Sequence, residues 1–177
     1  LSREVLVPAD PARDALEVVR LRFQLPPGAQ PGVPPAHVKV RAPDAPGQTG
    51  RVRAYSMLLG AGDAPRAFNL TVKVYPGGPP RSRGTSNYLG GVAVGESVHV
   101  PQTRTVPFAE APAGVRRAGM VAFGVGIAEC LEPMEELLRA GAEVRLLYAS
   151  RDEASIVHAA ELRALLAAHA SLRVHHF

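Results

Sequence analysis

The sequence predicts an antiparallel β barrel followed by an α/β domain with a parallel sheet. Three observations lead to this fold class. The first half alternates short runs of β-forming residues with Gly and Pro turns. A proline-containing stretch follows at 101–117. The last third repeats a strand–helix pattern with continuous apolar strands, which is typical of parallel sheets with right-handed crossovers.

Short strands account for most of the first half. The clearest is 68–75, where Phe68 and Leu70 alternate with Asn69 and Thr71, so that one face of the strand is apolar. Many short strands between Gly/Pro turns are typical of a small antiparallel barrel or sandwich. The expected strands are 4–7, 18–25, 37–41, 52–59, 68–75 and 98–100.

The last third carries two helices between three strands. The first helix has apolar residues at helical spacing from Ile127 to Leu138 and is ended by Gly141. The second is expected at 155–169, with Leu162, Leu165 and Leu166 facing inward. The strands are expected at 119–123, 144–148 and 172–177. We therefore divide the chain into a barrel domain at 1–105, a linker at 106–117 and a truncated α/β domain at 118–177.

Composition excludes several classes of protein. Of 177 residues, 46% are hydrophobic and 20% are charged, which predicts a buried core rather than disorder. The net charge of +4 suits an anionic cofactor or an acidic partner, but no dense Lys/Arg stripe indicates a nucleic-acid partner. No apolar run is long enough for a transmembrane segment. The single cysteine, Cys130, excludes an internal disulfide and a cysteine-based metal site. We expect an intracellular or organellar location.

Four motifs in the first half carry the chemical signal. The fourth expected strand contains Arg53-Ala54-Tyr55-Ser56. It is followed by Val72-Lys73-Val74-Tyr75, by Gly84-Thr85-Ser86-Asn87-Tyr88-Leu89 and by Val94-Gly95-Glu96-Ser97-Val98, with His37-Val38 upstream. In this order and spacing, the motifs resemble those of the ferredoxin–NADP reductase superfamily, and of its cytochrome b5 reductase branch in particular.

The resemblance implies a Greek-key barrel that binds FAD. Arg53 would pair with the flavin pyrophosphate, because a guanidinium offers a fixed bidentate cation. Tyr55 would stack on the flavin ring. Ser56, the candidate catalytic residue, would form a hydrogen bond near flavin N5, the atom that accepts hydride. Lys73 would lie near the flavin and the nicotinamide nucleotide.

The same resemblance assigns the segment at 84–86 to the pyrophosphate. Gly84 would let the backbone come close, and Thr85 and Ser86 would begin a short helix whose N-terminus favours an anion. Structural alternatives remain for single residues. Arg53 and Tyr55 would be unremarkable on a barrel surface, and Ser86 would serve as a helix cap.

The second half resembles the nucleotide-binding domain of the same family less completely. Gly124 and Gly126 stand where the family has its glycine-rich turn, and they are the candidate nucleotide-binding residues. Phe123, Ala128 and Glu129 replace the family's first Gly, its Thr and its Pro. A bulky ring and a carboxylate at a helix N-terminus both oppose a pyrophosphate. We therefore expect weakened nucleotide binding.

Two further features concern what this half binds. Ser150-Arg151 follows the second parallel strand, where a 2′-phosphate would fit, although a solvated loop is an equally good interpretation. The family's C-terminal strands are not found in this sequence, so either the sequence is partial or a partner protein or larger assembly covers the open sheet edge. His175 and His176 point to opposite faces of a strand and do not predict a metal site.

Two functions therefore stay open. The first is an FAD-dependent NAD(P)H oxidoreductase of the cytochrome b5 reductase type, in which the flavin takes hydride from a nicotinamide and passes electrons to a protein acceptor. The second is a degenerate reductase-like subunit with a structural or binding role in a larger complex, without turnover.

Overall fold

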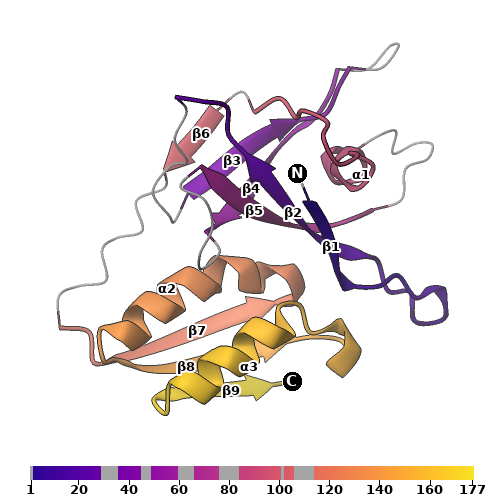
Figure 1. Ribbon diagram of the computed structural model, residues 1–177. Coiled ribbons are helices and arrows are strands. Elements are labelled where there is room, and N and C mark those ends of the chain that lie inside the picture. Colours follow the sequence, from indigo (N-terminus) through magenta and orange to yellow (C-terminus); the bar gives the residue numbers. More distant parts are fainter. Residues whose placement is uncertain are drawn as a thin grey trace. The chain divides into compact units, whose positions relative to one another are not determined.

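A computed structural model describes residues 2–28, 36–44, 49–59, 66–75, 84–100, 102–105 and 114–177. The chain divides into two compact units, Leu1–Val106 and Pro107–Phe177. They are called the barrel unit and the α/β unit below, and each is described by itself (Figure 1).

The barrel unit contains a six-stranded antiparallel sheet with strand order β1-β2-β5-β4-β3-β6. Strands β3, β4 and β5 form a meander, and β5, its last strand, returns to pair with β2. This is the Greek-key arrangement. The strands are β1 (Ser2–Val7), β2 (Val18–Gln24), β3 (Ala36–Arg41), β4 (Val52–Leu58), β5 (Ala67–Lys73) and β6 (Gln102–Thr105). A 3-10 helix, η1 (Pro11–Arg13), follows β1, and a short helix, α1 (Thr85–Gly90), follows β5.

The core of this unit follows the alternation in the sequence. Val19 and Leu21 on β2 are fully buried, as are Leu70 and Val72 on β5, because every second side chain of a strand points to the same face. Leu89 of α1 packs into the same cluster. The buried cluster is Val19, Leu21, Val38, Val40, Met57, Phe68, Leu70, Val72 and Leu89.

One expectation about the barrel unit is wrong. Residues 98–100 were predicted as a strand, but they form no regular structure. The sixth strand is β6, which lies a few residues later and pairs with β3, for example Val38 with Thr103. The cause is non-local: a strand forms where the β3 edge offers backbone partners, and residue type alone does not locate that edge.

The hairpin of β3 and β4 is joined to α1 through one carbonyl group. The oxygen of Arg51 accepts from the backbone N–H of Ala42, 3.1 Å away, and from the hydroxyl of Thr85, 2.7 Å away. Next to it, Gly50 has no room for a side chain, since a Cβ there would lie 1.7 Å from the oxygen of Ala42. The start of β4 is therefore fixed from two sides.

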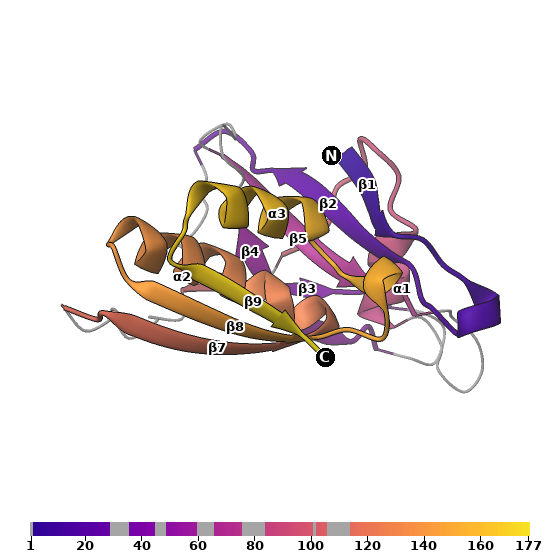
Figure 2. The same ribbon diagram turned by 90° about the horizontal axis from the view of Figure 1, so that it is seen from below.

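The α/β unit is a three-stranded parallel sheet with order β7-β8-β9. Its elements are β7 (Arg117–Phe123), η2 (Gly124–Ile127), α2 (Ala128–Arg139), β8 (Glu143–Ala149), η3 (Glu153–Ser155), α3 (Ala159–Ala168) and β9 (Leu172–His176). Both helices lie on one side of this sheet (Figure 2). The β8 side chains on that side, Val144, Leu146 and Tyr148, are fully buried, whereas Leu147 on the opposite side is 44% exposed.

The first helix of this unit confirms its sequence pattern, with Ile127, Leu131, Met134 and Leu138 buried. The second differs from the expectation. It begins at Ala159 rather than Ser155, because His158 has a left-handed φ of 59° that a continuous helix does not allow. Leu166 is 41% exposed, so it does not face the core as predicted. Among the described residues, no helix is long and apolar enough to cross a membrane.

Candidate functional site

Strand β4 presents two of the predicted site residues on one face. Arg53 and Tyr55 are opposite Val40 and Val38 of β3, and directly opposed residues share a face. Along this face exposure falls from Arg53, which is exposed, through half-buried Tyr55 to buried Met57. Ser56 lies on the other face of the strand.

The partner of Ser56 across the ladder is His37. Alternation along the strand therefore separates the Ser56 side chain from Arg53 and Tyr55. Its backbone still lies in the same segment of β4, and the ladder places His37 next to it.

Tyr55 is an aromatic ring with one side against the barrel core. Burial raises the pKa of Tyr55 to about 12, and the positive charge of Arg53 partly opposes that rise. The phenol therefore stays neutral at physiological pH. A neutral, half-buried ring beside an exposed guanidinium is suited to a flat aromatic ligand that carries an anionic arm.

Helix α1 brings the predicted turn at 84–86 to the start of β4. Gly84 precedes the helix, and no described atom lies within 4 Å of a Cβ placed there, so the space beside its Cα is open. The side chain of Thr85 is turned inward: the residue is 2% exposed, and its hydroxyl donates to the Arg51 oxygen. The Thr85 hydroxyl thus holds α1 against β4, and Ser86, which is half-buried, stands next to it.

Lys73 ends β5, and α1 reaches this strand as well. The Lys73 ammonium lies 5.7 Å from the centre of the Tyr75 ring, a cation–π contact. The amide of Asn87 in α1 donates to the Tyr75 oxygen at 3.2 Å. Helix α1 therefore bridges the strand that carries Arg53 and the segment that carries Lys73.

The glycine turn of the α/β unit lies between β7 and α2. Gly124 has a left-handed φ of 48°, so a side chain there would be strained, and no described atom lies within 4 Å of a Cβ at Gly126. Phe123 at its entrance is 66% exposed. Ala128 is buried, and Glu129 is exposed in the first turn of α2. The turn is preserved as a shape, but a bulky ring and a carboxylate stand next to it.

A cavity of about 590 Å³ opens at the carboxyl ends of β8 and β9. It contains the predicted Ser150 and Arg151, and also His176 at the end of β9. Two further lining residues, Arg163 and Phe177, were not singled out in the sequence. Asp152 orders its rim, since one carboxylate oxygen accepts from the N–H of Ser155 at 2.8 Å. No short motif marks Arg163, because it reaches the cavity from α3, a separate element.

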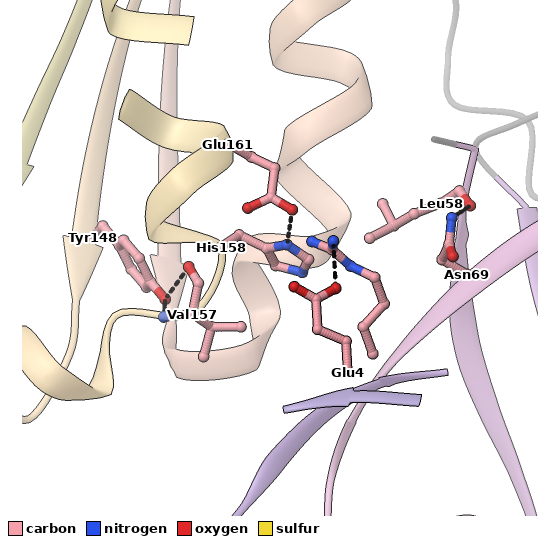
Figure 3. Close-up of polar contacts among 8 residues, drawn as sticks. Glu4, Leu58, Asn69, Tyr148, Val157, His158 and Glu161 are labelled. Carbon is pink, nitrogen blue, oxygen red and sulfur yellow. Dashed lines mark hydrogen bonds and ion pairs between the residues drawn. The ribbon is translucent and has the colours of Figure 1, made fainter. Parts of the chain in front are cut away.

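Two buried polar side chains, to which the sequence assigned no role, also lie close to this cavity. His158, 2% exposed, pairs through Nδ1 with Glu161 Oε1 at 3.2 Å (Figure 3). Tyr148 is fully buried and bonded to backbone groups. Within the described ranges, no group of three or more His, Cys, Asp or Glu residues could hold a metal ion.

Comparison with known proteins places this architecture. No protein-family model matches the chain. The NADH-cytochrome b5 reductase 1 of Pyricularia oryzae is 32% identical over 166 residues, which are 88% of this chain and 51% of that protein. The chain thus spans about half the length of the curated relative it matches.

Solved structures agree with this similarity. The cytochrome b5 reductase domain of Ulva prolifera nitrate reductase is 27% identical with a TM-score of 0.69, covering 90% of this chain and 66% of that one. Two others show the fold alone. The CS-b5R domains of human Ncb5or, in an NAD+ form, give a TM-score of 0.80 at 18% identity, over 99% of this chain and 49% of that one. Plasmodium falciparum ferredoxin-NADP+ reductase with 2'P-AMP gives 0.75 at 14%, over 99% and 70%. The chain therefore has the fold of the ferredoxin–NADP reductase superfamily and is cytochrome b5 reductase-like in sequence, with a barrel of the FAD-binding type and part of a domain of the NAD-binding type.

Proposed function

We propose that this chain binds FAD in its barrel unit and NAD(P)H in its α/β unit, as part of an oxidoreductase of the cytochrome b5 reductase type. The observation that carries the proposal is the joining of three predicted elements around α1: the β4 strand with Arg53 and Tyr55, the turn at Gly84, and Lys73 near Tyr75. When bound, FAD supplies a hydride acceptor that releases electrons singly to a protein acceptor.

The residues of the barrel unit fit such a group. Arg53 would hold the pyrophosphate, with the open space beside Gly84 admitting a close backbone approach. Tyr55 would offer a neutral ring face to the flavin. Ser56 would contact the flavin near N5 through its backbone, since its side chain lies on the other face of β4 from Tyr55. Lys73 would lie close to where flavin and nicotinamide meet. Thr85 would serve by holding α1, and Ser86 by offering polar groups to the phosphate.

The lining of the cavity in the α/β unit supports the proposal that a nucleotide binds there. Arg151 and Arg163 place two guanidinium groups in its lining, which would suit a phosphate on the adenosine ribose and so favour NADPH. The turn with Gly124 and Gly126 would receive the pyrophosphate.

The test of FAD binding uses the purified chain and a matched pair of variants. Wild-type protein reconstituted with FAD should show a bound-flavin absorption spectrum and saturable binding by calorimetry. Arg53→Ala should lose about 2–3 kcal/mol of FAD affinity, because it removes charge-assisted hydrogen bonds to the pyrophosphate. Arg22→Ala, an exposed arginine on β2, is the control and should bind FAD like wild type. Absence of bound flavin in the wild type would refute the proposal. Equal losses of FAD affinity in both variants would show that Arg53 has no specific role in binding FAD.

A second candidate is a reductase-like subunit without turnover, with a structural or binding role in a larger complex. Phe123 and Glu129 favour it, because they place an exposed ring and a carboxylate beside the glycine turn. This candidate shares the barrel with the first and differs from it in the expected rate of hydride transfer from a nicotinamide to the flavin.

A further inference from the structure

Tyr148 joins three parts of the α/β unit through one hydroxyl. It is the penultimate residue of β8 and is fully buried. Its oxygen lies 3.0 Å from the carbonyl oxygen of Gly124 and 3.3 Å from that of Val157. The same oxygen accepts from the Val157 N–H at 3.1 Å (Figure 3).

These contacts are more than packing of an aromatic ring. A phenol has one proton, so it donates to one carbonyl at a time, and the Gly124 oxygen is the nearer acceptor. A buried hydroxyl without partners would be costly, and these backbone groups are the partners it has. Burial raises the pKa of Tyr148 to about 12, while the hydrogen bond with Val157 acts in the opposite direction, so the donor persists at physiological pH.

The two loops that Tyr148 contacts belong to different parts of the proposed nucleotide site. Gly124 opens the turn that leads into α2, where a pyrophosphate would lie. Val157 stands between Ile156 and Ala159, which both line the cavity at the carboxyl ends of β8 and β9. His176, whose ring centre is 5.5 Å from that of Tyr148, lines the same cavity.

We propose that Tyr148 is a positioning residue. Its hydroxyl fixes the Gly124 turn relative to the Val157 loop, so that a dinucleotide extending from the turn to the cavity contacts both at once. This inference rests on the nucleotide binding proposed above. Tyr148 itself, being fully buried, does not touch the nucleotide.

The first experiment tests the coupling without any nucleotide. Tyr148→Phe keeps the ring and removes the hydroxyl. Hydrogen exchange should accelerate at Val157, which loses its acceptor, and also at Ala128, whose N–H donates to the carbonyls of Val125 and Gly126 in the turn. Acceleration at Val157 alone would mean that the turn is held by other contacts, and the inference would fail. Replacement of Tyr148 by 4-aminophenylalanine, which restores an N–H donor to the Gly124 oxygen, should return protection at Ala128.

The second experiment compares two ligands by calorimetry. NADP+ spans turn and cavity, whereas 2',5'-ADP carries only the adenosine end. We expect Tyr148→Phe to lose roughly tenfold more affinity for NADP+ than for 2',5'-ADP, equivalent to about 1.4 kcal/mol of coupling. A merely structural role would weaken both ligands equally, and that outcome would overturn the inference.

The wild-type measurements separate this inference from the proposed function. Equal wild-type affinity for the two ligands would show that the turn adds nothing, and would also overturn the positioning role. If the wild type binds neither ligand, the proposed nucleotide site is wrong, and the exchange experiment alone decides what Tyr148 holds together.

Discussion

Glu129 has opposite expected effects on folding and on ligand binding. It stands in the first turn of α2, where a carboxylate stabilises the helix dipole and repels a phosphate. Glu129→Gln should therefore lower the unfolding free energy by about 0.5 kcal/mol while raising the affinity for NADP+ at low salt. The gain should shrink as salt screens the charge. Urea unfolding and calorimetry at two ionic strengths provide the measurement, and a variant with unchanged affinity would show that the phosphate does not lie at this helix end.

Two tyrosines, half-buried Tyr55 and fully buried Tyr148, give the stability of the chain a dependence on alkaline pH. Burial raises the pKa of Tyr55 and of Tyr148 to about 12, above the usual value near 10. Between about pH 10 and 12 the unfolded chain releases protons that the folded chain keeps, so the stabilisation from the neutral phenols is present below pH 10 and lost as pH rises.

The matched comparison is Tyr148→Phe. Stability of the wild type should fall by up to about 1.4 kcal/mol more per pH unit in this window than that of the variant. Urea unfolding at several pH values measures both slopes. Parallel slopes would mean that Tyr148 ionises alike in the folded and unfolded chains.

At the scale of elements, the Thr85 hydroxyl ties the start of α1 to the residue that precedes β4. Thr85→Val preserves side-chain shape but removes the donor to the Arg51 oxygen, and should cost about 1 kcal/mol of stability. FAD affinity should fall with it, because α1 carries the turn at Gly84. Thr85→Ser keeps the hydroxyl and is the control. Denaturation and flavin titration measure both effects, and a Val variant that binds FAD like wild type would separate α1 from the flavin site.

The elements also show what a sequence specifies. Alternation located β2, β4 and β5 to within a residue or two, because one face of each is buried and the pattern records it. The sequence did not predict β6, because this strand forms by pairing with the edge of β3, which is distant in the sequence. The first residue of α3 was predicted wrongly, because the backbone torsion φ of His158 determines where this helix begins.

The candidate sites divide in the same way. Motif residues such as Arg53 and Gly84 are visible from the sequence because a local pattern carries them. Arg163 and Tyr148 are not, because their roles come from packing between separate elements. The inward turn of Thr85 likewise depends on a partner many residues away.

For the whole molecule, we expect slow reduction of bound flavin by pyridine nucleotides. Positioning supplies a large part of the rate of hydride transfer, and Phe123 and Glu129 place a bulky ring and a carboxylate beside the turn proposed to receive the nucleotide. A loss of roughly 4 kcal/mol of transition-state stabilisation corresponds to about a thousandfold in rate. Stopped-flow mixing of FAD-loaded protein with NADH or NADPH follows flavin bleaching, and dithionite is the control that the flavin can be reduced. Fast bleaching by either nucleotide would contradict this expectation and would exclude the second candidate function, a reductase-like subunit without turnover.

The strand order also determines the order in which strands can pair while the chain is being synthesised. Strand β2 must wait for β5, since Val18 pairs with Lys73 and Gln24 with Ala67, and β6 joins β3 only after residue 105 is made. In the α/β unit, by contrast, each strand pairs with the next one along the chain. Closing long loops before any pairing is gained slows folding. We therefore expect the barrel unit to fold more slowly than the α/β unit, with β2 exposed to misassociation until β5 emerges from the ribosome.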